Sequence, residues 1–493
     1  MSESSSHAVR QAIESNLDSH IGRIQRAVQQ PSVSVEQRGL REISELMVEY
    51  LDELGCDEAT LVETDGAPGV WGYYDAGAEK TLINYGMLDT RPVNPDDWDH
   101  DPFGGEIKET DEFGRVIYGR GSVKVKGAFV AWLNALESMK EALGELPVNV
   151  MFLLEAEEIN GSPYYYDMVD EYEGRLEEAD ACFCPLAGQG ADGNVTASLG
   201  YKSALYFTLD VSGSDWGRGP QGGAVHAMSN VTVDSPAWRM VDLLSSLTSD
   251  NGTHIDIEDY YDQYEPPTEE EREEIRQFVE TLDERTETPR DELWKHLPGL
   301  GRGAGEVENL TDDLHEDVVE AFIKHFYGPE SFNIQGISTG YLGPDTSTKP
   351  FTLPGDASAK FDLRMPRGYD PAIVRQQLRD HLDDHGFEDV KMEVSGQHTW
   401  CKTDPDSDLV EAARTVISDH GRGLTLWPFS AGGVPWAVFG STFDIPVLYG
   451  VGLGYGANSS GSNEFFAVDG NDAVGGLVDC ELSHAEMVIE YAK

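Results

Sequence analysis

The sequence predicts an α/β fold for about the first 200 residues. Hydrophobic residues recur at three- and four-residue spacing between Val9 and Val28, which is typical of an amphipathic helix that ends before Pro31. The segment VNVMFLLEAEE (148–158) is a continuous apolar run ending in carboxylates, as expected of a buried parallel strand. Helix and strand patterns alternate throughout this part, and that alternation predicts an α/β domain.

The elements between these two have their own signals. A second helix is expected over 41–54. The segments PGVWGYYDA and TLINYGMLDT follow, with the β-branched and aromatic residues of strands and turn-forming Gly and Pro around them. The next helix, KGAFVAWLNALESMKEAL, carries Phe129, Leu133 and Met139 on one face. Ligands bind beyond the carboxyl ends of parallel strands, so functional residues are expected there.

From SALYFTLDVSG onward the pattern changes to alternating strands, which resume at SFNIQGIST and SAKFDLRMP. An acidic stretch, TEEEREEIRQFVETL, interrupts them, and Thr268 and Glu271 have the spacing of a capping box at its start. We expect a helix there whose charged face is solvated. The last hundred residues return to α/β alternation.

The composition excludes several classes of function. The chain has 493 residues, and 90 Asp and Glu against 35 Lys and Arg give a net charge of −55. Such a chain is not a nucleic-acid binder that relies on a basic surface. With 39% hydrophobic and 10% aromatic residues it is too apolar to be a disordered acidic chain. We expect an acidic folded surface suited to concentrated salt; an acid-rich protein with a cationic partner is the alternative.

The sequence also predicts a compartment. Five thinly spread cysteines argue against a disulfide framework and for a reducing environment. The first residues lack the basic and apolar regions of a signal peptide, and no apolar stretch approaches the ~18 residues of a membrane span. We therefore expect a cytoplasmic protein with no membrane partner.

Seven segments, in order along the chain, resemble the aminoacylase, carboxypeptidase and carnosinase-like family of co-catalytic zinc hydrolases, relatives of acetylornithine deacetylase and succinyl-diaminopimelate desuccinylase. They are PSVSV, YGMLDTRPVNPDDWDHDPFGGEI, YGRGSVKVKGAF, EAEEINGSP, GYLGPDTSTKPFTLPGDASAKFDLR, AGGVP and SNEFF. The resemblance implies a zinc-exopeptidase-like catalytic domain with a mainly parallel sheet (1–202 and 395–493). An inserted α+β dimerisation or lid domain is expected at 203–394, with an acidic helical segment near 256–330. Family members cleave dipeptides or N-acyl amino acids with two zinc ions.

The family's metal-ligand positions carry other residues here. The family's His-x-Asp reads Met87-Leu88-Asp89, so the Asp is retained and the His is not. The bridging Asp falls on Lys124, whose ammonium cannot ligate a cation. Under this alignment the five ligand positions hold Met87, Lys124, Ile159, Leu186 and Ser460.

Two of these assignments have alternatives. An ungapped alignment of EAEEINGSP places the family's general base on Glu158 and the next ligand on Ile159. A one-residue shift would make Glu157 the base and restore a ligand, at the cost of an insertion. For the position assigned to Leu186, Pro185 is the alternative.

These changes predict that the two-zinc site is absent and that the protein takes no cofactor, because zinc needs three or four His, Cys or carboxylate ligands. Two zinc ions carry +4; exchanging three carboxylates for Ile159, Leu186 and Lys124 also changes the charge by +4. We therefore expect Lys124 to replace the charge of the metals, with its Nζ within about 4 Å of Asp89 or Glu158. The alternative is a surface lysine.

Other family positions give a mixed result. Arg364 matches the arginine that contacts substrate, and Asn333 and the Gly432–Gly433 turn lie in matching motifs. The lid-domain histidine falls on Gly217. Separately, Cys182 and Cys184 alternate along one expected strand; we interpret them as buried structural cysteines.

Three functions stay open, and whether the protein is an enzyme stays undecided. The first is a non-catalytic binding, regulatory or assembly protein that self-associates as a homodimer or larger and takes a small amino-acid or peptide ligand. The second is an active metallohydrolase that cleaves a dipeptide or N-acyl amino acid with a relocated or single metal and Glu158 as general base. The third is a structural protein that forms a larger homo-assembly.

Overall fold

The computed structural model describes residues 3–297, 317–343 and 349–493 and the single positions 300, 307, 310 and 314. The chain forms two compact units. Unit 1 contains Met1–Gly200, Lys402–Trp427 and Val438–Lys493, and unit 2 contains Tyr201–Cys401 and Pro428–Ala437. Residues 344–348, within one of the family-like segments, lie outside the described residues.

These boundaries differ from the expected 203–394 insertion in one respect that matters for the site. Residues 428–437, which include the Gly432–Gly433 turn, belong to unit 2 rather than to the first domain. Backbone and ring contacts hold it there: the N–H of Lys202 donates to the carbonyl of Ser430 at 3.2 Å, and Trp436 packs edge-on against Tyr201. The turn is therefore placed by the start of the unit 2 sheet.

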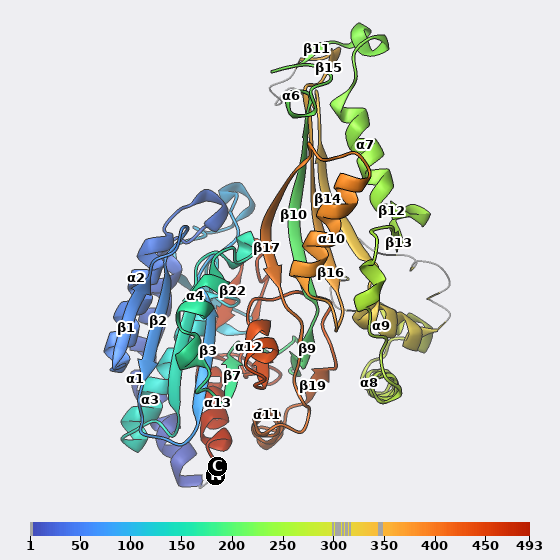
Figure 1. Cartoon of the computed structure of the whole chain (residues 1–493). Coiled ribbons are helices and arrows are strands. Elements are labelled where there is room, and N and C mark those ends of the chain that lie inside the picture. Colours follow the sequence, from blue (N-terminus) through green and yellow to red (C-terminus); the bar gives the residue numbers. More distant parts are fainter. Residues whose placement is uncertain are drawn as a thin grey trace. The chain divides into compact units, whose positions relative to one another are not determined.

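Unit 1 is built on an eight-stranded sheet in the order β1-β2-β6-β3-β7-β20-β8-β19 (Figure 1). The pairs β6–β3, β3–β7, β7–β20 and β8–β19 are parallel, which confirms a mainly parallel sheet. The strands are β1 (Glu58–Val62), β2 (Gly69–Tyr74), β3 (Thr81–Met87), β6 (Asn149–Glu155), β7 (Ala181–Cys184), β8 (Val195–Ser198), β19 (Leu424–Trp427) and β20 (Val447–Tyr449). Every residue of β3 and β6 is buried, as their apolar runs predicted.

Helices cover both faces of this sheet. Gly86 of β3 faces α3, because a Cβ at Gly86 would lie 2.8 Å from the ring of Phe129. The neighbouring Tyr85 faces the opposite side and packs edge-on against Tyr165 of α4, with ring centroids 5.4 Å apart. The helices of unit 1 are α1 (Glu3–Gln29), α2 (Leu40–Leu54), α3 (Lys126–Leu143), α4 (Tyr165–Glu171), α5 (Glu173–Leu176), α11 (Asp408–Asp419), α13 (Leu477–Tyr491) and most of α12 (Ala437–Thr442).

A smaller antiparallel sheet lies beside the large one in unit 1, in the order β21-β22-β5-β4. Its strands are β4 (Glu106–Thr110), β5 (Gly114–Tyr118), β21 (Gly456–Ala457) and β22 (Phe465–Ala467). The strand β22 begins within the family-like SNEFF segment, at Phe465. The sheet therefore fixes the loop that carries Ser460.

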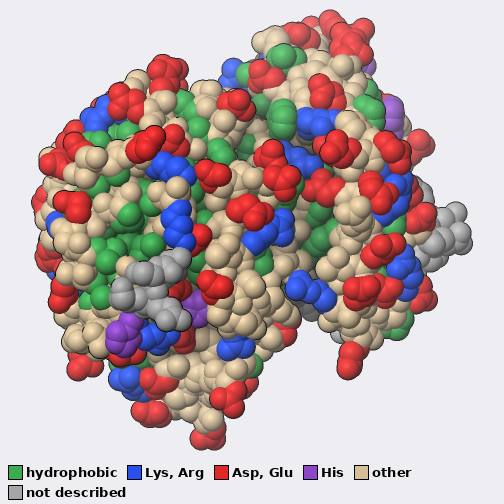
Figure 2. Space-filling view, turned by 90° about the horizontal axis from the view of Figure 1, so that it is seen from below, with side chains coloured by type: hydrophobic (Ala, Val, Ile, Leu, Met, Phe, Trp, Pro, Cys, Tyr) green, Lys and Arg blue, Asp and Glu red, His purple; other side chains and the backbone are tan. Residues whose placement is uncertain are grey.

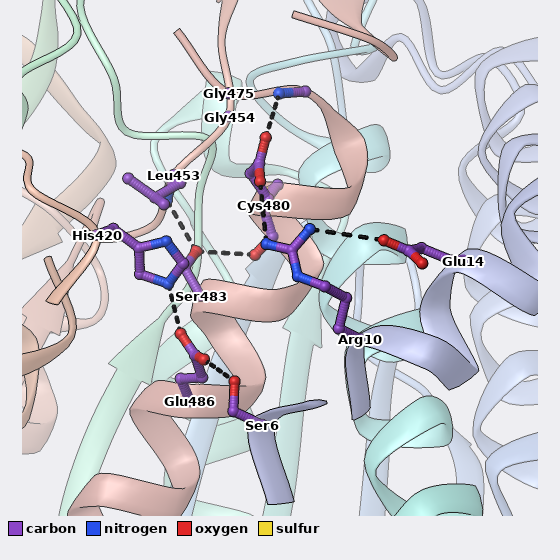
Figure 3. Close-up of polar contacts among 12 residues, drawn as sticks. Ser6, Arg10, Glu14, His420, Leu453, Gly454, Gly475, Cys480, Ser483 and Glu486 are labelled. Atoms are coloured by element: carbon purple, nitrogen blue, oxygen red, sulfur yellow. Dashed lines mark hydrogen bonds and ion pairs between the residues drawn. The ribbon is translucent and has the colours of Figure 1, made fainter. Parts of the chain in front are cut away.

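The first and last helices are joined by polar contacts (Figure 3). Glu486 of α13 accepts a hydrogen bond from Ser6 of α1, and its Oε2 lies 2.5 Å from Nε2 of His420, the C-cap residue of α11. Deeper along the same helices, the buried carboxylate of Glu481 contacts His20 Nδ1 at 2.7 Å. These buried contacts tie α1 to α13 at specific residues, beyond the apolar packing that the helical periodicity predicted.

Unit 2 is built on an antiparallel sheet in the order β14-β16-β10-β17 (Figure 1). The helices α7 and α10 pack on one face of it, over a core that contains Phe207, Phe361, Leu243 and Leu378. The strands are β10 (Ser203–Ser212), β14 (Ser331–Ser338), β16 (Asp356–Met365) and β17 (Lys391–His398). The α+β architecture expected for the insertion is therefore present.

The remaining elements of unit 2 are short or lie outside this sheet. The capping box predicted at Thr268 and Glu271 is present at the start of α8. The helices are α6 (Gly213–Trp216), α7 (Pro236–Leu247), α8 (Glu269–Arg285), α9 (Val318–Tyr327) and α10 (Pro371–Asp384), and the short strands are β11 (Val225–His226), β12 (Thr248–Ser249), β13 (His254–Ile255) and β15 (Thr352–Leu353). The two-residue strands β9 (Gly200–Tyr201) and β18 (Cys401–Lys402) lie where the chain passes between the units.

The surface carries the acidic excess. Figure 2 shows Asp and Glu side chains spread across the visible face, with fewer Lys and Arg among them. All five cysteines are free thiols, as their number and spacing predicted. Within the described ranges, no helix combines the length and apolar character needed to cross a bilayer.

Candidate functional site

Asp89 is fully buried just after the end of β3, and three donors surround its carboxylate. Ser34 donates its hydroxyl to Oδ2 at 2.5 Å. The backbone N–H groups of Glu158 and Ile159 donate to Oδ1 and Oδ2, each at 3.0 Å. Asp89 therefore fastens the loop after β6, which begins with the short helix η3 (Glu158–Asn160), to the end of β3.

Several carboxylates gather around this point, and burial together with their charges raises the pKa values of Asp89 and Glu155. Burial and the nearby charge of Glu158 raise the pKa of Asp89 to about 7, although its hydrogen bonds act in the opposite direction. Burial and the charge of Asp89 raise the pKa of Glu155 well above its usual range. Glu155 accepts hydrogen bonds from Tyr85 and Ser162, each at 2.8 Å. A cation bound nearby would lower these pKa values.

Three of the five ligand positions meet at one small cavity. Met87, Lys124 and Leu186 line a space of about 20 Å³ between the ends of β3 and β7. The other two are linked to their surroundings by their backbone: Ile159 donates to Asp89, and Ser460 donates to Glu464 at 3.3 Å. The N–H of Lys124 also donates to Glu464, at 3.3 Å. The fold thus brings the five positions into one region of unit 1.

The prediction that Lys124 forms an ion pair with Asp89 or Glu158 is wrong. Neither carboxylate lies within the 4.0 Å ion-pair distance of Lys124 in the described part of the chain, and the partners of Asp89 are Ser34 and two backbone groups. Lys124 precedes α3 and is half-buried beside the cavity. The alternative of a surface lysine stays open, because Lys124 is partly exposed.

The deeply buried lysine is Lys126, two residues further on. Its Nζ donates to the carbonyl of Gln30 at 2.7 Å and contacts that of Val28 at 3.4 Å, at the end of α1. Burial lowers its pKa to about 7. Lys126 therefore binds the C-terminal end of α1, where carbonyl groups without a helical N–H partner attract a cation.

A buried ion pair holds the segment that contains Ser460. Arg120 Nη1 lies 3.1 Å from Glu464 Oε2, and both side chains are almost completely inaccessible to solvent. The same guanidinium donates to the carbonyl of Gly461 at 2.8 Å. Removing one partner of such a pair would leave a buried unpaired charge, so this contact is a structural anchor of the region.

In unit 2, the retained residues Arg364 and Asn333 meet at Asp362. Arg364 Nε donates to Asp362 Oδ1 at 3.0 Å, and Asn333 Nδ2 donates to Oδ2 at 2.8 Å. Gln335 donates to the same Oδ2 at 3.0 Å. The Arg364 side chain is 29% exposed, so Asp362 orients a guanidinium that solvent can still reach.

The Gly432–Gly433 turn lies beside this group. A Cβ at Gly433 would be 2.3 Å from the Cβ of Ala204, and Ala204 pairs with Arg364 across β10 and β16. The close backbone approach explains why a glycine is required at Gly433. Gly432 donates its N–H to Ser430 Oγ at 3.2 Å, which shapes the turn.

Sequence reasoning missed the residues that position the predicted ones. Ser34 lies in the PSVSV segment and Glu464 in SNEFF, so both were in quoted motifs without an assigned role. Asp362 lies two residues before Arg364, on the same face of β16, a spacing that could have suggested the contact. The partners across the fold could not be read from the sequence.

The candidate residues thus form two groups, one in each unit: Asp89, Glu158 and Lys124 in unit 1, and Arg364, Asn333, Gly432 and Gly433 in unit 2. Among the residues that the structure describes, no three His, Cys, Asp or Glu side chains are grouped so that they could hold a metal ion. Met87, Lys124 and Leu186 supply a thioether, an ammonium and an alkyl group. These side chains do not fit a two-zinc site at the family's positions.

The chain is similar to a peptidase family and to several known dipeptidases. The profile described as "Peptidase family M20/M25/M40" matches residues 85–473. The Beta-Ala-His dipeptidase of Mus musculus is 29% identical over 359 residues, covering 69% of this chain and 64% of that protein. The chain thus spans less than two thirds of that relative's length. The Cys-Gly metallodipeptidase DUG1 of Candida albicans is 24% identical over 445 residues, 84% of each protein.

Solved structures share the fold of this chain. An M20 family metallo-carboxypeptidase, Sso-CP2 from Sulfolobus solfataricus, superposes with a TM-score of 0.77 at 26% identity, covering 96% of this chain and 99% of that one. Human carnosine dipeptidase 1 gives a TM-score of 0.70 at 21% identity, covering 99% of both chains, which supports the fold.

These comparisons overturn the prediction that the protein takes no cofactor. Relatives that match most of the chain are named metallodipeptidase and metallo-carboxypeptidase, so the family context implies a metal. That prediction took the loss of ligands at five positions as the loss of metal binding by the whole protein. The family resemblance read from the motifs, in contrast, is confirmed: the chain belongs to peptidase family M20/M25/M40.

Proposed function

We propose that this protein binds a carboxylate-bearing ligand of the dipeptide or N-acyl amino acid class and releases it without hydrolysis, as a binding or regulatory protein. The ligand class comes from the relatives, which are named as dipeptidases. One observation carries the proposal: Met87, Lys124 and Leu186 enclose a cavity of only about 20 Å³ at the ends of β3 and β7. None of these three side chains is an imidazole or carboxylate ligand, so the cavity does not reproduce a two-zinc site.

The environment of the retained carboxylates supports the same conclusion. The carboxylate of Asp89 already accepts three hydrogen bonds, so it acts as a fastener for the η3 loop. Glu158 is the candidate base, and its side chain is half-buried. A general base takes a proton from a nucleophile within hydrogen-bond reach, and in metal hydrolases a metal ion activates that nucleophile. The neighbouring ligand positions hold a thioether, an ammonium and an alkyl group, and none of these replaces a carboxylate ligand.

Recognition of the ligand is assigned to unit 2. Arg364 can bind a carboxylate through charge-assisted hydrogen bonds, and Asp362 fixes its orientation through Nε. Asn333 is held by the same carboxylate and is placed one strand away on β14. The Gly433 backbone lies against Ala204, the cross-strand neighbour of Arg364. The group therefore combines a rigid cation with polar neighbours.

Replacing Arg364 with methionine is expected to weaken binding of β-Ala-His, Cys-Gly or an N-acyl amino acid by about 10- to 100-fold, because a hydrogen bond to a charged group contributes about 1.5–3 kcal/mol. Isothermal titration calorimetry in high salt measures the effect. Arg375→Met is the matched control: Arg375 is exposed on α10, and its loss should leave the dissociation constant unchanged. Equal affinities of the wild type and Arg364→Met would contradict the assignment.

We also propose that the protein self-associates through the edge of the unit 2 sheet. The strand β14 lies at that edge, and its last six residues are exposed. Ile334 and Ile337 on this strand are 42% and 50% exposed, and Leu342 beyond it is 65% exposed. An exposed edge strand with apolar side chains is a template for pairing with another chain.

Ile337→Lys is expected to raise the dimer dissociation constant at least ~10-fold, because a charged side chain would have to be buried in the contact. Sedimentation equilibrium of the full chain measures this. Ile373→Lys is the control, since Ile373 is 49% exposed on α10, away from the strand edge. If both variants associate as the wild type does, the interface lies elsewhere.

The free thiols are consistent with a reducing compartment, and on that basis we assign the protein to the cytoplasm.

A further inference from the structure

A second deeply buried lysine, Lys202, lies in unit 2, one residue before β10. It is 2% exposed. Its Nζ donates to the backbone carbonyl of Gly328, the C-cap residue of α9, at 2.9 Å. Among the residues that the structure describes, no carboxylate oxygen lies within the 4.0 Å ion-pair distance of this nitrogen. Lys202 is therefore a buried ammonium that is held by a neutral acceptor.

Arg364 is a second cation in the same part of the sheet. Ala204 lies two residues after Lys202 and pairs with Arg364 across β10 and β16. Burial lowers the pKa of Lys202 from 10.5 to about 7; the charge of Glu330 acts in the opposite direction, and the charge of Arg364 lowers the pKa further. Lys202 is thus close enough to Arg364 for the two positive charges to repel each other.

The charged groups that act on Lys202 are Glu330, one residue before β14, and Arg364 on β16. His398 lies on β17, the strand on the other side of β10. Burial and the charge of Arg364 lower its pKa to about 3, so its imidazole is neutral at pH 7. The segment 428–437, which is hydrogen-bonded to the backbone of Lys202, contains no titratable residue. Arg364 is therefore the neighbour whose effect on Lys202 a bound carboxylate would change.

A ligand carboxylate bound to Arg364 would reverse this effect. Its negative charge would offset the guanidinium charge and attract the buried ammonium, and both changes raise the pKa of Lys202. Near pH 7 the free protein holds this amine partly neutral, whereas the complex would hold it protonated. Each binding event would therefore take up to one proton from solvent. His398 starts from a pKa of about 3, so it would stay neutral at this pH.

We propose that binding of a ligand carboxylate at Arg364 is coupled to the uptake of a proton by Lys202, which makes the affinity for the ligand dependent on pH. The coupling rests on the proposed function, because it requires a ligand at Arg364. It is reciprocal, so protonation of Lys202 strengthens binding by the same factor by which the ligand favours protonation. The affinity is therefore highest below about pH 7 and falls as the pH rises through this value.

Isothermal titration calorimetry of the full chain with N-acetylglycine tests the coupling. This ligand has a carboxylate and no group that titrates between about pH 6 and 9. Titrations at about pH 7.5 in phosphate and in Tris, two buffers that differ strongly in ionisation enthalpy, give the number of protons taken up. We expect roughly 0.5 proton per ligand. The dissociation constant should rise about 3- to 10-fold between about pH 6.5 and 8.5.

Lys202→Met removes the titrating amine and keeps a side chain of similar length, and the loss of an unpaired buried charge need not destabilise the fold. Its binding enthalpy should be the same in both buffers, and its dissociation constant should not change over this pH range. Lys360→Met is the matched control, because Lys360 is exposed on β16 and its loss should leave the proton uptake unchanged. If Lys202→Met does not fold, Glu330→Gln keeps the test decisive: loss of the Glu330 charge should move the pH-dependent range to lower pH.

Two results would overturn the coupling and leave the proposed function standing. One is an equal binding enthalpy in both buffers for a wild type whose affinity still depends on Arg364. The other is unchanged proton uptake in folded Lys202→Met, or an unmoved pH range in Glu330→Gln. A wild type that does not bind N-acetylglycine overturns the coupling as well, and if it also fails to bind β-Ala-His and Cys-Gly, the proposed function fails with it.

Discussion

Asp89→Ala is expected to lower the free energy of unfolding by about 3–5 kcal/mol at pH 5. The substitution leaves buried hydrogen-bond donors without an acceptor, and each such donor costs about 1–3 kcal/mol. The N–H groups of Glu158 and Ile159 would lose their acceptor, and Ser34 would lose its partner. The η3 loop would then be free of β3. Chemical denaturation followed by circular dichroism measures the change.

Asp111→Ala is the control, because Asp111 is exposed in the turn between β4 and β5, and a change within about 0.5 kcal/mol is expected there. A loss at position 89 no larger than that of the control would show that the carboxylate does not fasten the loop.

The same carboxyl predicts a pH dependence with a definite sign. Its pKa is raised from 3.8 to about 7 in the folded chain, by burial and by the charge of Glu158. The folded state therefore holds this proton more tightly than the unfolded state. The stabilisation is complete below pH 3.8 and is lost as the pH rises through 7. Asp89→Asn should remove this part of the slope between those values.

Lowering the KCl concentration from about 3 M to about 0.1 M is expected to lower the free energy of unfolding by several kcal/mol. The net charge is −55, and repulsion between surface carboxylates is screened over about 3 Å at 1 M salt but over about 10 Å at 0.1 M. The visible surface carries these acids broadly rather than in one cluster (Figure 2). Thermal unfolding across a KCl series measures the effect.

A parallel series in sucrose at matched osmolality separates charge screening from general exclusion of cosolvents. Screening requires that KCl stabilise the protein far more than sucrose does. A melting temperature that is flat, or that falls as KCl rises, would show that the acidic surface is not an adaptation to salt.

The fold could be predicted because its signals are local. The helix periodicity between Val9 and Val28 and the apolar run of β6 gave the α/β layer, and motif order gave the family. The 428–437 segment could not be assigned, because contacts between distant residues, such as Lys202 with Ser430 and Ala204 with Gly433, decide where it belongs.

The site was only partly predictable. The charge of the changed ligand positions predicted a role for Lys124. The deeply buried lysine nearby is instead Lys126, which lies at the start of α3 and contacts the end of α1, and this contact depends on how α1 and α3 pack together. Arg364 was identified from its motif, yet its partner Asp362 emerged only from the side-chain geometry of one strand face. Side-chain partners between distant segments are the information that spacing does not carry.

The central claim is that the protein binds its ligand and does not hydrolyse it. The direct measurement is mass spectrometry of β-Ala-His, Cys-Gly and an N-acyl amino acid after long incubation with the full chain in high salt, with Zn²⁺ or Mn²⁺ supplied. We expect the bound ligand to be recovered intact, both with the wild type and with Glu158→Gln. Release of the free amino acids by the wild type, abolished in Glu158→Gln, would contradict it and identify an active hydrolase.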